Sequence, residues 1–131
     1  MITLDTHVLV WWIGLPNKLS TRAKRLIEKA SDKKEILVSS ISVWEIYLLV
    51  KKGRLKLAMD TDTWIEKIET LDSIRFVPVD NRIAAKSVML PDPLHPDPAD
   101  RLVIATALVE GAVLITADKR ILNYPHVQTM W

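Results

Sequence analysis

The chain has 131 residues, close to the length of one ordinary domain, and 49% of them are hydrophobic and 26% charged, as in an average globular protein. This composition excludes a disordered or collagen-like chain, and the absence of cysteine excludes disulfides, a zinc–thiolate centre and a cysteine nucleophile. Eighteen basic and sixteen acidic residues give a formal net charge of +2, which is too small for a histone-like polycation but compatible with a local nucleic-acid surface.

The apolar stretches of the chain are short. Those such as Val8 to Leu15 have about eight residues, whereas a transmembrane helix needs roughly 18 to 20. No basic segment precedes the first apolar residues, so we expect no signal peptide and a protein that acts in the cytoplasm. Only three glycines occur, so a glycine-rich phosphate loop is not expected.

The first half of the chain alternates apolar runs with amphipathic segments. Residues 2–5 predict a buried strand, and residues 6–13 predict a helix that ends near Gly14. Ser20 is a favourable N-cap for a helix over about 20–31. The next expected elements are a strand at 36–39, a helix from Ser40 or Ser42 that Gly53 closes, and a helix at 61–71.

The second half continues the alternation. Residues 75–79 predict a strand near a sheet edge, because Pro78 cannot donate to a ladder, and a helix at 80–88 follows. Residues 90–98 hold four of the seven prolines and predict a stiff surface loop. The remaining expected elements are a helix from Pro98 to about Glu110 with Asp97 as its cap, a strand at 112–116, a short helix opened by Asp118, and a last strand within 127–130.

Strands that alternate with helices require crossover connections. We therefore expect one domain over residues 1–131, with a central, mainly parallel sheet of four to five strands and helices on both faces. Ligands of such sheets bind beyond the carboxyl ends of the strands.

Five carboxylates are expected near that edge. Asp5 ends the first strand, Asp118 follows the strand at 112–116, and Glu45 lies in the helix after the second strand. Asp97 and Asp100 are three residues apart and share one face of a first helical turn. Crowded carboxylates repel one another unless cations compensate, and Mg²⁺ or Mn²⁺ with oxygen ligands does this.

Each of these acids also has a purely structural interpretation. The aspartates are common N-caps, and Asp100 would also favour the positive end of a helix dipole. Glu45 fits this interpretation less well, because it shares a helix face with Ile41, Leu48 and Leu49. Either a metal or a buried arginine such as Arg101 would account for its position.

Four sequence blocks together resemble a known family. They are Asp5-Thr6-His7, the block SISVWE at 40–45, the block DPADRLVIATA at 97–107, and Thr116-Ala117-Asp118. The chain resembles the PIN-domain family, and within it the VapC-type toxin ribonucleases of bacterial toxin–antitoxin pairs. The resemblance implies a three-layer α/β/α fold, metal-dependent endoribonuclease activity, a homodimer, and a cognate antitoxin that blocks the acidic site.

The resemblance also implies roles for individual residues. Asp5, Glu45 and Asp100 match the family's acidic metal ligands and Asp118 its fourth acid, which makes all four the expected catalytic residues around one or two Mg²⁺ or Mn²⁺ ions. Thr116, Asp97 and Arg101 are expected to support these ligands rather than to bind the metal. The family often has arginine where this chain has Pro96. Metal-activated water would hydrolyse the phosphodiester, so His7, His95 and His126 are not required as bases.

Two groups of basic residues are candidates for RNA contacts, although charge runs are usually solvated helix faces. The first group follows one helical stripe and the second is a dense run without an acid. The candidate residues are Lys18, Arg22, Arg25 and Lys29 in the stripe, extended by Lys33, and Lys51, Lys52 and Arg54 in the run, extended by Lys56.

The tryptophans are expected mainly in the core. Trp11, Trp12, Trp44 and Trp64 all fall on apolar helix positions, and one of the adjacent pair Trp11 and Trp12 is expected at the surface.

Three other functions match parts of this pattern. A housekeeping or DNA-directed nuclease shares the acidic chemistry, but the chain leaves no room for an added DNA clamp. A phosphoacceptor receiver domain would need an acidic neighbour for Asp5 and has no role for Glu45. A non-catalytic RNA-binding module would have no use for the whole set of acids. An upstream reading frame for an antitoxin would favour a toxin over a housekeeping enzyme.

Overall fold

The computed structural model describes residues 1–94 and 96–131, so His95, expected in a turn, lies outside the described residues. In this part of the chain all strand pairs are parallel and form one sheet in the order β3–β2–β1–β4–β5. The expectation of a parallel sheet is confirmed. The strands are β1 (Ile2–Leu4), β2 (Ile36–Ser39), β3 (Ile74–Val77), β4 (Val113–Ile115) and β5 (Thr129–Met130).

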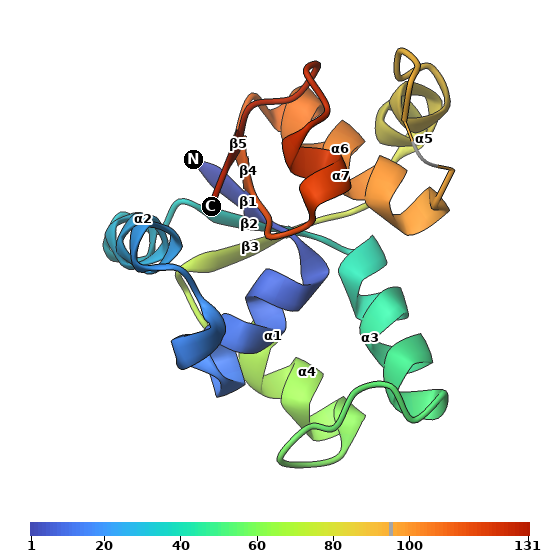
Figure 1. Cartoon of the computed structure of the whole chain (residues 1–131). Helices are drawn as coiled ribbons and strands as arrows, with labels where there is room; N and C mark the ends of the chain where they lie inside the picture. Colours follow the sequence, from blue (N-terminus) through green and yellow to red (C-terminus); the bar gives the residue numbers. More distant parts are fainter. Residues whose placement is uncertain (95) are drawn as a thin grey trace.

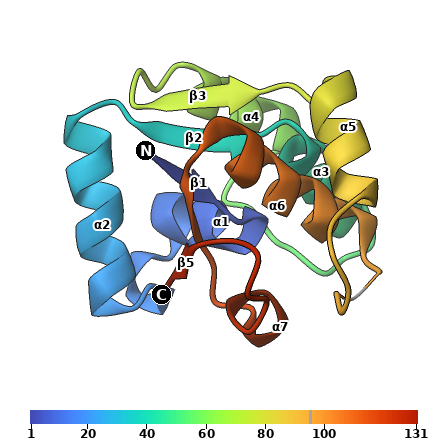
Figure 2. The same cartoon turned by 90° about the horizontal axis from the view of Figure 1, so that it is seen from above.

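Helices cover both faces of the sheet, which confirms the three-layer arrangement. Figure 1 shows α1, α3 and α4 below the sheet and α5, α6 and α7 above it, and Figure 2 shows α6 lying over the strands. The α-helices are α1 (Thr6–Gly14), α2 (Thr21–Asp32), α3 (Ile41–Lys51), α4 (Thr61–Glu69), α5 (Asn81–Val88), α6 (Pro98–Glu110) and α7 (Lys119–Leu122).

The core consists of apolar side chains on the two faces of the sheet. On one face, Val8 and Leu9 of α1 pack with Ala23 and Ile27 of α2 in one buried cluster. On the other face, α6 contributes side chains such as Ile104. The central strand β1 is buried throughout, including the polar Thr3, because helices cover both faces of the sheet.

Short polar side chains begin most of the helices at the expected positions. The Ser20 hydroxyl accepts a hydrogen bond from the amide of Ala23 at 3.0 Å, as its N-cap role predicts. Asp97 caps α6 by accepting from the amide of Asp100 at 3.1 Å, and Pro98 occupies the first position. Gly111 ends α6 in the left-handed region with φ of 66°, where a side chain would be strained.

A few boundaries differ from the prediction. Residues Pro16–Lys18 form a 3₁₀ helix that was not expected, and β5 is limited to Thr129–Met130. Strand β3 is an edge strand as expected, but Pro78 follows it rather than interrupting its ladder. In the described part of the chain, no helix is both long enough and apolar enough to cross a membrane.

The strand order determines where a ligand site forms. From β1 the chain proceeds to β2 and β3 on one side and later returns to β4 and β5 on the other side. The order therefore reverses between β1 and β4, and the crevice beyond their carboxyl ends is the usual ligand position in such sheets. Asp5 follows β1 directly, and Thr116 follows β4 directly.

Candidate active site

An acidic pocket of about 380 Å³ lies at this switch point. It brings together all five carboxylates that the sequence singles out, although they come from distant parts of the chain. The lining residues are Asp5, His7, Trp11, Glu45, Asp97, Asp100, Ala117, Asp118 and Arg120.

Asp5 is the most buried of these acids, with 7% of its surface exposed. Its Oδ1 accepts a hydrogen bond from the amide of Thr6 at 2.8 Å, and its Oδ2 accepts one from the Thr116 hydroxyl at 2.7 Å. Burial raises the pKa of Asp5, and the two hydrogen bonds partly offset this effect. Both oxygens are therefore fixed in direction, as a ligand that must be held in place requires.

Thr116 connects two of the acids. Besides donating to Asp5, its hydroxyl oxygen accepts a hydrogen bond from the amide of Asp118 at 3.1 Å. One buried hydroxyl thus orients the carboxylate of Asp5 and also holds the backbone amide of Asp118. Thr116 was expected to support the metal ligands, and the structure places its hydroxyl between Asp5 and Asp118.

Glu45 reaches the pocket from α3. The helix is joined to α1 by a hydrogen bond of 2.8 Å between the hydroxyls of Ser42 and Thr6. Burial raises the pKa of Glu45, and a hydrogen bond from Thr6 opposes that shift. Thr6 therefore contacts both Ser42 and Glu45, and its amide holds Asp5.

Asp100 is half-buried on the first turn of α6. Its pKa is raised to about 7, first by burial and then by the negative charges of Asp5, Asp97, Glu45 and Asp118. The part of this shift that comes from neighbouring charges indicates that the five acids are close enough to repel one another. A divalent cation would relieve both the repulsion and the burial cost.

The donor set fits a hard divalent cation, because it consists of carboxylate oxygens. Among the described residues, no three His, Asp or Glu side chains form a ready-made group around one point. Mg²⁺ does not require one, since proteins usually hold it through one or two carboxylates and leave water and phosphate oxygens in the other positions. Asp5, Glu45, Asp100 and Asp118 are the residues that would hold it.

Arg120 is a pocket residue that the sequence analysis missed. Its Nη2 donates to Asp118 Oδ2 at 3.2 Å and its Nε lies 3.4 Å from Oδ1, while its amide donates to Oδ1 at 2.8 Å. Asp118 therefore both caps α7 and pairs with an arginine. The sequence signal that could have pointed to Arg120 was its position two residues after Asp118, just inside a short helix.

Arg101 lies outside this group of pocket-lining residues. Its Nε donates to the carbonyl of Ser87 at 3.0 Å and its Nη2 to that of Val88 at 3.3 Å, so it stabilises the carboxyl end of α5. Asp97 does line the pocket, and it also caps α6. The structure thus places Asp97 among the acids, whereas Arg101 is hydrogen-bonded to the end of α5.

The basic residues divide by position. Lys52 and Arg54 line a hollow of about 220 Å³ that shares Glu45 and Asp97 with the acidic pocket. Lys18 lies 5.9 Å from the ring centre of Trp11, a residue of the acidic pocket.

The rest of the expected helical stripe extends away from the acids. Helix α2 leads into the amino end of β2. Lys29 is near the carboxyl end of this helix, so it lies toward the amino ends of the strands, opposite the acids. Arg22, nearer the start of the helix, donates from its Nη2 to the sulfur of Met130 at 3.1 Å. Arg25 and Lys51 are exposed.

The prediction that Trp44 packs in the core is wrong. Its side chain is 55% exposed, whereas Trp64 is buried as expected and Trp11 and Trp12 are partly buried. Trp44 lies on a helix that is rich in apolar residues, and this pattern suggested burial. The structure instead places it on the wall of the hollow that contains Lys52 and Arg54.

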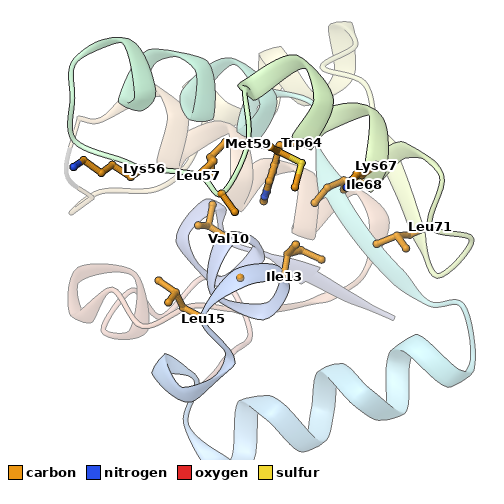
Figure 3. A pocket seen from close by; sticks show the side chains of 12 residues that line it. Val10, Ile13, Leu15, Lys56, Leu57, Met59, Trp64, Lys67, Ile68 and Leu71 are labelled. Atoms are coloured by element: carbon orange, nitrogen blue, oxygen red, sulfur yellow. The ribbon is translucent and has the colours of Figure 1, made fainter.

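Another cavity, of about 500 Å³, is larger than the acidic pocket. Figure 3 shows it between α1, α4 and the segment that precedes α4, with Val10, Ile13, Trp64 and Leu71 among its walls. Its lining contains two lysines and no carboxylate, so it lacks the groups that metal-dependent hydrolysis needs. The carboxylates that were expected to bind a metal line the smaller acidic pocket instead.

The fold and the acidic site together define a class of protein. The family model of the PIN domain matches residues 2–127, and the chain belongs to this family. The curated protein Ribonuclease VapC22 of Mycobacterium tuberculosis is 36% identical over 132 residues, a match that covers 99% of this chain and 98% of the relative.

Solved structures of the same fold come from toxin–antitoxin complexes. VapBC2 from Rickettsia felis, bound to a DNA fragment from its promoter, matches with a TM-score of 0.73 and 17% identity over 99% of this chain and 98% of that chain. FitAcB from Neisseria gonorrhoeae matches with a TM-score of 0.70 and 21% identity over 100% and 97%. Both matches extend over the whole PIN fold.

Proposed function

We propose that this chain is a metal-dependent endoribonuclease that acts in the cytoplasm as the toxin of a toxin–antitoxin pair. The observation that supports this most directly is the convergence of Asp5, Glu45, Asp100 and Asp118 on one pocket at the switch point of the sheet. The similarity to a ribonuclease over nearly the whole chain supports the choice of RNA as substrate.

In this mechanism the carboxylates of Asp5, Glu45 and Asp100 would hold one or two Mg²⁺ or Mn²⁺ ions, with Asp118 as a further ligand. When bound, such an ion would activate a water molecule and neutralise charge on the phosphate. Thr116 keeps Asp5 in its binding orientation through the 2.7 Å hydrogen bond. No side chain has to act as a nucleophile, which suits a pocket without serine or cysteine among its lining residues.

The test is cleavage of single-stranded RNA by Asp5→Asn in the presence of Mg²⁺. This variant removes one charge and keeps the side-chain shape, and we expect activity to fall by at least about 100-fold. Asp72→Asn is the matched control, because Asp72 is 78% exposed and pairs with Lys34 away from the pocket. Undiminished RNA cleavage by Asp5→Asn would refute the assignment, and cleavage of single-stranded DNA alone would favour the DNA-directed alternative.

The proposed protein partner is a cognate antitoxin. The structural neighbours are complexes of a toxin with its antitoxin, which supports the same arrangement for this chain. Expression of the intact chain should arrest growth, and co-expression of the product of an adjacent small reading frame should restore it. Growth arrest that Asp5→Asn also causes would separate toxicity from the acidic site.

We also propose that the chain forms a homodimer. Val88 and Met89, at the end of α5, are 73% and 75% exposed, and adjacent exposed apolar side chains are typical of an interface. Size-exclusion chromatography with light scattering should give twice the chain mass at micromolar concentration. A monomer at that concentration would contradict the proposal.

A further inference from the structure

The hollow beside the acidic pocket contains an exposed aromatic ring. Trp44 is 55% exposed, although large aromatic side chains gain free energy when they are buried. It projects from α3, one residue before the proposed metal ligand Glu45. An exposed tryptophan next to a reactive site suggests contact with a ligand, because such rings supply a flat stacking surface.

Two elements form the walls of this hollow. From α3 and the turn after it come Trp44, Glu45, Leu48, Leu49, Lys52 and Arg54, and from the start of α6 come Asp97, Pro98 and Ala99. Trp44, Leu48 and Lys52 are spaced by four residues and therefore share one face of the helix. Because Glu45 and Asp97 also line the acidic pocket, the two cavities are adjacent.

Charge changes sign along the hollow. Its end at Glu45 and Asp97 is acidic and adjoins the proposed metal, whereas its other end has Lys52 and Arg54. Within the part of the chain that the structure describes, neither basic residue forms an ion pair. At a rise of about 1.5 Å per helical residue, Glu45 and Lys52 are about 10 Å apart along α3, which leaves room for a nucleoside between two phosphate-binding ends.

We propose that this hollow binds one unpaired nucleotide of the RNA substrate, whose base stacks on Trp44 while a neighbouring phosphate contacts Lys52 and Arg54. The volume of about 220 Å³ suits a single base rather than a larger ligand. The stacking contact accepts any base, so it would position single-stranded RNA over the acids without reading a sequence. This inference rests on the proposed ribonuclease function and adds a binding residue to it.

The experiment measures binding without cleavage, by fluorescence anisotropy in EDTA. One probe is a short labelled RNA of mixed sequence, and the other is the same ribose–phosphate chain with its bases removed. Trp44→Ala should weaken binding of the first probe by about 5- to 150-fold, the range of one lost stacking contact, and leave binding of the second probe unchanged. Trp44→Phe should retain most of the affinity for RNA because it keeps an aromatic face.

Tyr47→Ala is the matched control. Tyr47 is also an exposed aromatic residue of α3, but it donates a hydrogen bond to Asp62 of α4 and does not belong to the lining of the hollow. We expect its removal to leave binding of both probes unchanged. Thermal unfolding of each variant checks the fold, and Trp44→Leu provides a second loss of the aromatic face with less loss of apolar surface.

Four outcomes would overturn the inference. Equal RNA affinity of Trp44→Ala and wild type would refute the stacking role. If the wild type still cleaved RNA with Mg²⁺, the proposed function would stand. Equal losses on both probes would mean that the base is not the contact. A change of oligomeric state in Trp44→Ala and Trp44→Leu would assign the face to an interface between copies. Wild-type protein that neither binds nor cleaves RNA would refute the inference and the proposed function together.

Discussion

At the scale of single residues, individual hydrogen bonds determine the geometry of the site. Thr116 illustrates this, because one buried hydroxyl donates to Asp5 and accepts from the amide of Asp118. Its β-branched side chain also suits the end of a strand. The same residue therefore serves the local conformation and the orientation of a proposed metal ligand.

Thr116→Val should impair activity more than stability. Valine has nearly the same shape, so the loss is that of two hydrogen bonds, about 1–2 kcal/mol in the free energy of unfolding. A misoriented metal ligand should lower RNA cleavage by about 10- to 100-fold. The matched control is Thr106→Val, which removes another buried hydroxyl that donates to the carbonyl of Leu102 at 2.8 Å in α6. Equal activity of the two variants would show that the Thr116 hydroxyl has no orienting role.

Asp100 predicts a pH dependence of stability in metal-free protein. Its pKa is about 7 in the folded state and about 3.9 when unfolded. Because the folded state disfavours the charged form, the free energy of unfolding should fall as the pH rises from about 4 to about 7. Three pH units imply about 4 kcal/mol, which solvent screening of this half-buried group reduces to about 1–2 kcal/mol.

Asp100→Asn tests that dependence. The variant should be more stable than wild type by about 1–2 kcal/mol at pH 8 and nearly equal to it at pH 4, as measured by urea unfolding in EDTA. Asp72→Asn is the control, because this exposed carboxylate should show no such difference between the two pH values. A variant that is less stable than wild type at pH 8 would contradict the repulsion among the five acids.

At the scale of secondary-structure elements, the ends of the helices decide which side chains reach the pocket. Asp5 caps α1, Asp97 caps α6 and Asp118 caps α7, so structural and catalytic interpretations of these acids are compatible. The cap fixes the backbone, and a carboxylate oxygen that accepts an amide still has lone pairs for other partners. A choice between cap and ligand is therefore unnecessary for these residues.

Two glycine substitutions should have opposite effects on stability. Gly111 ends α6 with φ of 66°, and Gly111→Ala should cost about 1 kcal/mol because alanine is strained there. Gly14 is the last residue of α1, and an added Cβ would meet no atom within 4 Å, so Gly14→Ala should stabilise by up to about 1 kcal/mol. Thermal unfolding of both variants checks this, and RNA cleavage should be retained in both.

At the scale of the whole molecule, the sheet topology and the charge distribution act together. The parallel sheet gathers acids from residues 5 to 118 at one edge, where their repulsion opposes folding. The molecule thus concentrates negative charge where a cation is needed, although its formal net charge is only +2.

Mg²⁺ should therefore stabilise the folded protein. A ligand present at about 100 times its dissociation constant adds about 2.7 kcal/mol when it binds only the native state. We expect the melting temperature to rise with Mg²⁺ in the wild type and much less in an Asp5→Asn, Asp100→Asn double variant. KCl at matched ionic strength is the control for the general salt effect. The same Mg²⁺ dependence in both proteins would place the binding site elsewhere.

The sequence by itself determined the local features of this protein. Hydrophobic periodicity, caps and glycines located the helices and strands to within a few residues, because these signals act over a few neighbouring positions. The spacing of Asp5, Glu45, Asp100 and Asp118 relative to those elements was also sufficient to expect them at one edge of a parallel sheet.

The tertiary structure decided what faces the pocket and what faces away from it. Arg120 pairs with Asp118, which was not foreseen. Arg101 was expected to support the acids but binds the end of α5. Trp44 was expected in the core but is exposed beside Lys52 and Arg54. Long side chains reach across several ångströms, and their partners depend on how α3, α5, α6 and α7 pack. The residues next to a side chain in the sequence indicate whether it prefers to be buried or exposed. Only the packing of the whole molecule determines whether it is buried and which residues it contacts.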